Sequence, residues 1–437
     1  MQRRTFLKGV VLGAGAAWPL PFVGLSPALA DTVREPSAKP ATDYLPMHQK
    51  VSQDSSLPGS WYILDRSKAP PKLVDRPSLV PVGPRELVMF EKTKTRVYRG
   101  PSNRYASLIT LPGDIGDEQL LLACLPTIRG KDGEIVPCSL NYCPGRRAGN
   151  IYGEVVAGRC PAEFSVSIKF VLLMSPVLTD DQQRSIALTL SRRKPRSSRR
   201  QHLSRGFPAP DFTDGGPAFL DLPPGDTYFQ TISSVLERAR AAIQDSVDPR
   251  FATNQFMDPD LIRKTGKGGC VQLTRLAEKA LAGVARSSYV VAFRDGIDVK
   301  DLARYPSQSP GFLYPGLGHA FLVVEDPESG SYFFADPSKA FPYMGPHPGN
   351  VIVERLLEHE DHTLVVPSKI PWPIDKGRML VDLDFSDQAV ARMGNVTYTA
   401  SSRHGPEAGR YRAWLDGAPG EFRQVAEAVN RRHHGTR

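Results

Sequence analysis

The chain has 437 residues, 41% of them hydrophobic, and a formal net charge of +9 at pH 7. This length and composition suit two globular domains with buried cores, plus linkers. The modest basic charge is compatible with anionic lipid headgroups or cell-wall polymers, but no nucleic-acid-binding motif accompanies it, so we expect no nucleic-acid partner.

The first thirty residues have the pattern of a twin-arginine export signal. Arg3 and Arg4 precede a short apolar stretch rich in Gly and Ala, and residues 28–30 provide a small-x-small cleavage site. A retained membrane anchor is the weaker interpretation, because this apolar run is too short and too rich in glycine to span a bilayer comfortably. We therefore expect export by the twin-arginine translocase, cleavage after Ala30, and a mature periplasmic or extracytoplasmic protein with no stable membrane span. Removing residues 1–30 takes away three basic residues and no acidic one, so the formal charge falls from +9 to +6.

Residues 31–84 are rich in Pro, Ser and Lys and have few periodic apolar positions, which predicts an extended N-terminal arm. The run Trp61–Leu64 is a candidate for docking this arm onto a domain. Residues 85–180 change to short strand-like runs separated by turn residues, so we expect an all-β domain there. Val97–Gly113 is similar to bacterial SH3-like cell-wall modules, with an unrelated β-sandwich as the alternative. The expected strands are Leu87–Phe90, Thr95–Tyr98, Ser107–Leu111, Gln119–Leu125, Asn150–Val156 and Phe164–Met174.

Residues 181–225 contain a run of basic side chains without an acidic one, followed by several prolines, and are expected to form a linker. A solvated tether is the plain interpretation, and an anion-binding strip is the functional alternative. A helix is expected next, at about residues 227–247, because apolar residues recur there at helical spacing.

The five cysteines divide into four and one. Cys124, Cys138, Cys143 and Cys160 cluster in the first half of the chain, whereas Cys270 stands alone. In an oxidising compartment the four could form two disulfides, which leaves Cys270 as the thiol. No spacing indicates a zinc site, since no paired histidines accompany these cysteines.

Cys270 follows two glycines and opens a helical pattern. The thiol therefore lies at or near a helix N-terminus, where unpaired N–H groups and the positive end of the helix dipole favour the thiolate. The apolar positions that recur at spacings of three and four are Leu273, Leu276, Ala277, Ala280, Leu281 and Val284.

His319 and Asp336 lie on two apolar runs that a turn at residues 326–329 separates. If these four residues form a symmetric hairpin loop, His319 lies directly opposite Asp336. A carboxylate beside an imidazole fixes its tautomer and supports the imidazolium, which a thiolate-generating base requires. Alternation along the strands then places four further residues on the same face as the pair, namely Phe321, Val323, Tyr332 and Phe334.

Each of the three residues alone has a plain structural interpretation: a small buried thiol, a structural histidine and an aspartate that shapes a turn. We favour a joint catalytic site because nucleophile, base and orienting carboxylate belong to one reaction.

This arrangement resembles the transglutaminase-like superfamily, whose members share a papain-like thiol hydrolase core. The matching motifs are GGC at Gly268–Cys270, GHAF at Gly318–Phe321 and ADPS at Ala335–Ser338. The resemblance implies an α+β fold, in which an all-β domain precedes a transglutaminase-like (papain-like) catalytic domain at residues 226–372. It also implies that Cys270 is the nucleophile, His319 the base and Asp336 the residue that orients the base. Many relatives have an aromatic residue where Val271 follows the nucleophile, a departure that concerns the substrate cleft more than the chemistry.

The leading hypothesis is an exported cysteine peptidase or amidase that acts through a thioester on Cys270 and needs no cofactor. The substrate would be an amide bond of a protein, peptide or peptidoglycan-like polymer. Gln255 is a candidate to assist the N–H of Cys270 in holding an oxyanion, with a surface loop as the plain alternative. Two other functions stay open: an acyltransferase that forms amide cross-links, and a non-catalytic module that binds envelope polymers.

Beyond the motif, His359 and His362 lie among acidic residues, where a charged helix end is a better interpretation than a metal site. Residues 373–437 contain strand-like runs at Met379–Phe385 and Val396–Ala400, and a basic helical tail at Glu421–Arg437. We expect them to be a small appendage on the catalytic domain and assign them no function.

Overall fold

The structure is a computed structural model, and its described residues are 47–51, 60–66, 72–80, 82–97, 105–144, 151–192, 228–245, 259–281, 285, 287–294, 318–326, 329–338, 343–349, 351–357, 380–383, 396–399 and 420–434. The chain divides into two compact units, Met1–Ala38 and Lys39–Arg437, and every described residue belongs to the second. The predicted export signal, Gln255, His359 and His362 lie outside the described residues. No helix in the described part of the chain is both long and apolar enough to cross a membrane.

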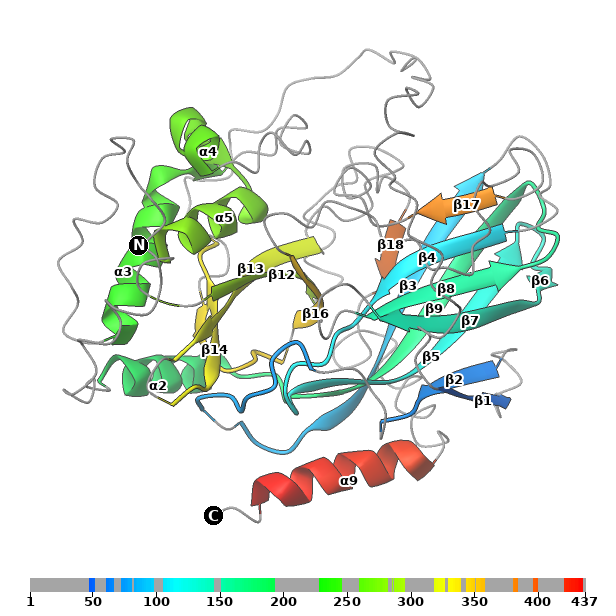
Figure 1. Ribbon diagram of the computed structural model, residues 1–437, viewed down its shortest axis with the longest axis horizontal. Helices are drawn as coiled ribbons and strands as arrows, with labels where there is room; N and C mark the ends of the chain where they lie inside the picture. The colour runs from blue at the N-terminus through cyan, green and yellow to red at the C-terminus, as the bar shows by residue number, and fades with distance from the viewer. Residues whose placement is uncertain are drawn as a thin grey trace, which may run out of the picture. The chain divides into compact units, whose positions relative to one another are not determined.

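The described chain has a mixed α/β structure with several sheets and a few helices (Figure 1). Two sheets are built mainly from the first half of the chain. The first sheet contains, in hydrogen-bonded order, β1 (Met47–Val51), β2 (Ser60–Leu64), β5 (Gln119–Gly130), β9 (Glu163–Met174), β3 (Glu86–Val97) and β18 (Val396–Thr399), with β6 (Ile135–Val136) on β5. The second sheet contains β17 (Leu380–Leu383), β4 (Tyr105–Leu111), β8 (Ile151–Ala157) and β7 (Cys138–Pro144).

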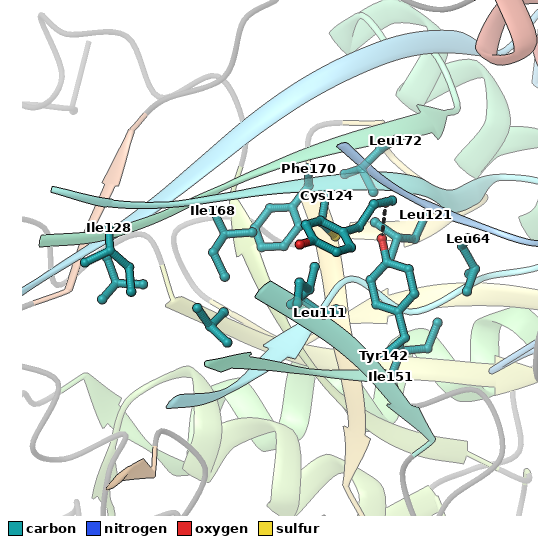
Figure 2. Close-up of a cluster of buried hydrophobic side chains, with 14 of the residues drawn as sticks. Leu64, Leu111, Leu121, Cys124, Ile128, Tyr142, Ile151, Ile168, Phe170 and Leu172 are labelled. Carbon is teal, nitrogen blue, oxygen red and sulfur yellow. Dashed lines mark hydrogen bonds between the residues drawn. The ribbon is translucent and has the colours of Figure 1, made fainter. Parts of the chain in front are cut away.

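These two sheets share one apolar core, as in a β-sandwich. Figure 2 shows Cys124 and Phe170 of the first sheet beside Tyr142 of the second. The buried Tyr142 hydroxyl donates to the carbonyl of Tyr62 at 2.5 Å, so its polar end is satisfied inside the core.

Strand β9 illustrates how the sequence pattern produces this packing. Its first half alternates between buried and partly exposed residues, which is the pattern of a strand with one covered face. Its last residues are buried on both faces, because helix α9 (Gly420–His434) covers the outer side of the sheet. Phe422 and Val429 of this helix pack in one cluster with Val171 and Leu173 of β9.

The N-terminal arm is more ordered than its composition predicts. Strands β1 and β2 pair with each other, and β2 pairs with β5, so part of the arm belongs to the first sheet. Trp61 and Tyr62 are 2% and 3% exposed, and they pack in the clusters on the two faces of that sheet. Hydrophobic docking of these side chains outweighs the weak strand pattern of the segment.

Two further expectations need correction. The predicted linker does not begin at residue 181, because helix α2 (Asp180–Ser191) occupies its start. Thr179 and Gln182 form a capping box at the N-terminus of this helix, and Leu190 is buried. The C-terminal segment is not an appendage of the half that contains residues 226–372, since β17, β18 and α9 all pack against the β-rich half.

The half that carries Cys270, His319 and Asp336 contains a five-stranded sheet covered by helices on one face. Its strands, in hydrogen-bonded order, are β15 (Tyr343–Gly345), β14 (Tyr332–Asp336), β13 (Gly318–Glu325), β12 (Ser287–Arg294) and β16 (Val351–Leu357). Figure 1 shows the helices grouped beside this sheet, namely α3 (Tyr228–Ala242), α4 (Pro259–Thr265) and α5 (Cys270–Leu281). A short two-stranded pair, β10 (Gln244–Asp245) with β11 (Lys267–Gly268), connects the ends of α3 and α4.

The helices bury their apolar stripes against one face of this sheet. Leu273, Leu276 and Ala277 of α5 pack in one cluster with Leu322 of β13 and Phe333 of β14. The helical spacing of apolar residues after Cys270 therefore identifies the buried face of α5 correctly.

The register of the β13–β14 hairpin differs from the expected one by two residues. Glu325 pairs with Tyr332, so the loop comprises six residues rather than four. Two local features produce the longer loop: Gly330 has a φ of 66°, and Asp326 accepts a hydrogen bond from the Ser329 hydroxyl at 2.5 Å. A shift of two keeps every side chain on its face. The four residues expected beside the His–Asp pair accordingly lie together in one buried cluster, namely Phe321, Val323, Tyr332 and Phe334.

The expected disulfides are not present among the described cysteines. Cys124, Cys138, Cys160 and Cys270 form none, and the side chain of Cys143 lies outside the described residues. Cys124 is enclosed in the core, where it packs in one cluster with Tyr142.

Candidate active site

Cys270 is the first residue of α5, and its neighbours fix the start of that helix. The carbonyl of Gly269 accepts from the N–H of Leu273 at 3.0 Å, which makes Gly269 the N-cap. Oε1 of Gln272 accepts from the N–H of Gly269 at 3.0 Å and closes the turn. A side chain at position 268 would not fit, because a Cβ on Gly268 would lie 2.5 Å from the Cβ of Gln272. The two glycines therefore permit a tight helix start that places Cys270 at the positive end of the helix.

His319 and Asp336 are in hydrogen-bond contact at one end of β13 and β14. Nε2 of His319 is 2.5 Å from Oδ2 of Asp336, and the two side chains are 6% and 7% exposed. The second carboxylate oxygen, Oδ1, accepts from the N–H of Ser338 at 2.8 Å. Both oxygens of Asp336 are thus engaged, which fixes the carboxylate toward the imidazole.

Cys270 is the other group that acts on the imidazole, because the interaction of its side chain with His319 raises the pKa of the histidine. Because Nε2 faces Asp336, Nδ1 is the ring nitrogen that remains for the thiol. Burial lowers the pKa of His319, but the hydrogen bonds and charges of Asp336 and Cys270 outweigh burial and raise this pKa from 6.5 to about 9. The imidazole is therefore protonated at neutral pH, the form that pairs with a thiolate.

An aromatic layer adjoins the imidazole. The ring of Phe321 stacks on His319 with centroids 5.9 Å apart, and Phe334 lies 5.3 Å from Phe321. The ring of His347 meets that of Phe334 edge-on, with centroids 5.0 Å apart. These rings are buried, so the His–Asp pair lies in a low-dielectric environment in which its electrostatic interactions are strong.

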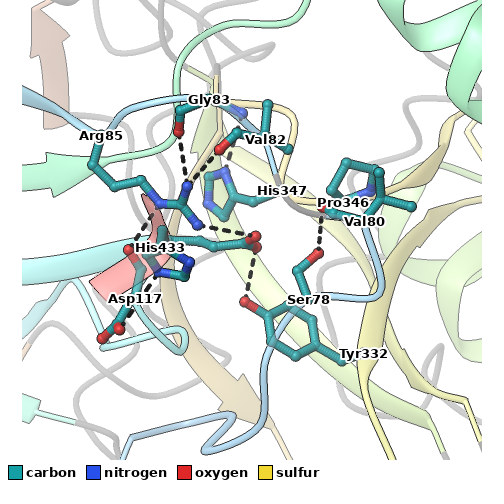
Figure 3. Close-up of polar contacts among 12 residues, drawn as sticks. Ser78, Val80, Val82, Gly83, Arg85, Asp117, Tyr332, Pro346, His347 and His433 are labelled. Carbon is teal, nitrogen blue, oxygen red and sulfur yellow. Dashed lines mark hydrogen bonds and ion pairs between the residues drawn. The ribbon is translucent and has the colours of Figure 1, made fainter. Parts of the chain in front are cut away.

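A buried polar network lies beyond this layer, where the arm and the β-rich half meet β14 (Figure 3). The hydroxyl of Tyr332 donates to Oε2 of Glu118 at 2.8 Å, and Arg85 lies 3.5 Å from Oε1. Arg85 also donates to the carbonyls of Gly83 and Asp117, at 2.9 Å and 3.1 Å. Nothing in the sequence pattern indicates this network, because its members are far apart in the chain and none belongs to a motif.

The structure thus brings together Cys270, His319 and Asp336, while Gln255 lies outside the described residues. Gln272 and Ser338 have no predicted role, although Gln272 closes the turn before Cys270 and Ser338 donates to the carboxylate of Asp336. The sequence did carry a signal for each: a glutamine three residues after the N-cap, and a residue two positions after an Asp-Pro turn. Across the described segments, no three His, Cys, Asp or Glu side chains gather where they could hold a metal ion.

No family model matches the chain, and no curated protein matches it either. A solved structure of a proposed cysteine protease from Cytophaga hutchinsonii matches with 9% identity and a TM-score of 0.37, over 62% of this chain and 81% of that chain. A proposed protease from Parabacteroides distasonis matches with 11% identity and a TM-score of 0.21, over 58% of this chain and 43% of that chain. At TM-scores this low, neither match supports a functional assignment.

Proposed function

We propose that this protein is an exported cysteine peptidase or amidase of the transglutaminase-like type, with Cys270 as nucleophile, His319 as acid and base, and Asp336 as the orienting carboxylate. The observation that carries this proposal is the position of His319, whose imidazole is 2.5 Å from the carboxylate of Asp336 and interacts with the side chain of Cys270. A structural histidine needs partners, but this pair of partners supplies what a thiol nucleophile requires.

In the proposed reaction the thiolate of Cys270 attacks the carbonyl carbon of an amide, and a C–S bond forms. The developing oxyanion is held by the N–H groups of the first turn of α5, where the N-cap residue Gly269 has no side chain to compete for them. The C–N bond then breaks, and the imidazolium of His319 transfers its proton to the leaving nitrogen. Neutral His319 next takes a proton from water, the hydroxide attacks the thioester, and the carboxylic acid leaves as the C–S bond breaks.

Alkylation by iodoacetamide tests the site without a known substrate. Cys270 should react faster in the wild-type protein than in His319→Ala at neutral pH, because the imidazolium supports the thiolate. His433→Ala, which removes a histidine of α9 instead, is the matched control and should leave the rate unchanged. Equal rates in the wild type and His319→Ala would refute the catalytic pairing.

Activity-based profiling of a periplasmic extract, with Cys270→Ala as the negative control, would then identify the amide substrate. Adding a primary amine to the captured thioester distinguishes the two fates of the acyl group. Release of the free acid supports the proposed hydrolase, whereas an amide product would identify the enzyme as an acyltransferase.

A further inference from the structure

The backbone ladder between β13 and β14 ends short of the His–Asp pair, and a proline explains why. Hydrogen-bonded pairs alternate along an antiparallel ladder, and the bond from the Asp326 N–H to the Ser331 carbonyl, at 2.8 Å, marks one such pair. If every second pair is counted from Asp326 and Ser331 in the observed register, Ala320 and Pro337 are the next residues that should form a hydrogen-bonded pair beyond the end of the ladder. Because Pro337 has no N–H, it cannot donate to the carbonyl of Ala320.

Side chains of two helices take the place of the missing ladder bonds. Oγ1 of Thr274, on α5, donates to the carbonyl of Ala320 at 2.9 Å, and Thr274 is fully buried. Nε of Arg240, on α3, donates to the carbonyl of Pro337 at 3.1 Å. The carbonyls of Ala320 and Pro337, beyond the end of the ladder, thus accept hydrogen bonds from side chains of the helices rather than from the neighbouring strand.

Both residues of the hydrogen bond between Thr274 and Ala320 are close in sequence to the proposed reacting residues, Cys270 and His319. Thr274 lies four residues after Cys270, which is one turn along the same face of α5. Ala320 directly follows His319 on β13. One buried hydrogen bond therefore ties the helix that carries the thiol to the strand that carries the imidazole, next to both groups.

We propose that Thr274 is a positioning residue, whose hydrogen bond to Ala320 sets the separation between the Cys270 thiol and the His319 imidazole. Arg240 holds the other strand in the same way, through the residue that follows Asp336. This inference rests on the proposed function, because the separation matters only if thiol and imidazole act together.

Thr274→Val tests the inference, because valine keeps the shape of threonine and removes the donor. We expect the alkylation rate of Cys270 at pH 7 to fall roughly tenfold, since small displacements of reacting groups are costly. The pH profile of alkylation should move toward that of His319→Ala, a change that a purely structural role would not produce. Thr274→Ser keeps the hydroxyl and should restore most of the rate. Thr189→Val is the matched control, because Oγ1 of Thr189 donates to the carbonyl of Ser185 at the same 2.9 Å, on α2.

The outcomes separate this inference from the proposed function. If the wild type reacts faster than His319→Ala while Thr274→Val behaves as the wild type, the inference is overturned and the proposed function stands. If the wild type and His319→Ala react equally, the proposed function fails, and the inference fails with it. If Thr274→Val does not fold, Arg240→Met tests the same end of the ladder: a several-fold slower reaction supports the inference, and an unchanged rate overturns it.

Discussion

Asp336 lies diagonally across the β13–β14 ladder from His319, and its Oδ2 is 2.5 Å from Nε2 of the imidazole. Directly opposite residues have Cβ atoms about 4.5–5.5 Å apart, whereas diagonal neighbours are about 7–8 Å apart. The diagonal arrangement leaves room for the imidazole ring and a hydrogen bond between the two strands. The register of the hairpin therefore contributes to the site as much as the identities of the two residues.

Replacing Asp336 by asparagine should keep the fold and reduce the reactivity of the site. Asparagine has the size of aspartate and can still accept from the N–H of Ser338, but it carries no charge to support the imidazolium. The pKa of His319 should fall from about 9, and the alkylation rate of Cys270 at neutral pH should fall roughly tenfold or more. Histidine NMR titration and alkylation kinetics measure the two effects. Asp326→Asn, in the loop of the same hairpin, is the control, and equal rates in both variants would contradict the orienting role.

The raised pKa of His319 should make folding stability depend on pH. Folding raises this pKa from 6.5 to about 9, so the stabilisation is complete below about pH 6.5 and is lost as the pH rises through 9. The loss should reach at most about 3 kcal/mol, which corresponds to this shift. Urea unfolding at several pH values measures it, with His319→Gln as the reference that lacks the titrating group. Parallel pH profiles for the two proteins between pH 6.5 and 9 would show that His319 has no raised pKa.

Local patterns in the sequence were sufficient to predict the helix that begins at Cys270 and the face of the sheet on which His319 and Asp336 lie. The apolar spacing after Cys270 identifies α5, and a period of two places His319 and Asp336 on one face. The register itself was predicted wrongly by two residues, because loop length depends on Gly330 and on a side-chain bond of Asp326. The contact between Thr274 and Ala320 could not be predicted, since it depends on how a helix docks on a strand forty-six residues away.

Pairing between residues far apart in the sequence explains most of the other differences between the expected and the observed structure. The strand β2 joins β5 across a wide sequence separation, and a composition rich in Pro and Ser conceals that pairing. The capping box of Thr179 and Gln182 was present in the sequence, but the basic run that follows it directed the interpretation toward a linker. The C-terminal helix was predicted from its own residues, whereas the surface that it covers is formed by strands from the first half of the chain.

The cysteines should differ sharply in reactivity in the folded protein. Burial raises the pKa of the Cys124 thiol to about 12 and that of Cys138 to about 11, so neither forms a thiolate near neutral pH. Brief treatment with iodoacetamide at pH 7, followed by peptide mapping, should find the label on Cys270. Unfolding in urea before labelling should expose Cys124 and Cys138, which serves as the internal control. Early labelling of Cys124 in the folded protein would contradict its position in the core.

The predicted export signal at residues 1–30 gives a prediction that is independent of the proposed active site. Lysine keeps the charge of arginine but not the paired guanidinium groups, so Arg3→Lys with Arg4→Lys should leave the unprocessed protein in the cytoplasm. Cell fractionation and N-terminal sequencing measure the location and the cleavage. Lys8→Arg, outside the arginine pair, should export normally. A mature chain that begins at Asp31 in the periplasm of the double variant would rule out the twin-arginine route.

The buried pair of Tyr332 and Glu118 should make the contact between the β-rich half and β14 sensitive to pH. Burial raises the pKa of Glu118, with Arg85 and the Tyr332 hydroxyl opposing that effect. A carboxyl group with a raised pKa costs stability as the pH rises above its unfolded value of about 4.5, because the unfolded state then loses its proton more readily than the folded state does. Tyr332→Phe removes the donor at 2.8 Å, so its cost should be small near pH 4 and on the order of 1–3 kcal/mol at pH 7.

Tyr343→Phe is the matched control, because its hydroxyl donates to the carbonyl of Pro346 at 2.6 Å, and its cost should not vary with pH. Adding Glu118→Gln to Tyr332→Phe should abolish the pH dependence, since no charge is left to bury. A cost of Tyr332→Phe that is the same at pH 4 and pH 7 would mean that Glu118 is not charged at this contact.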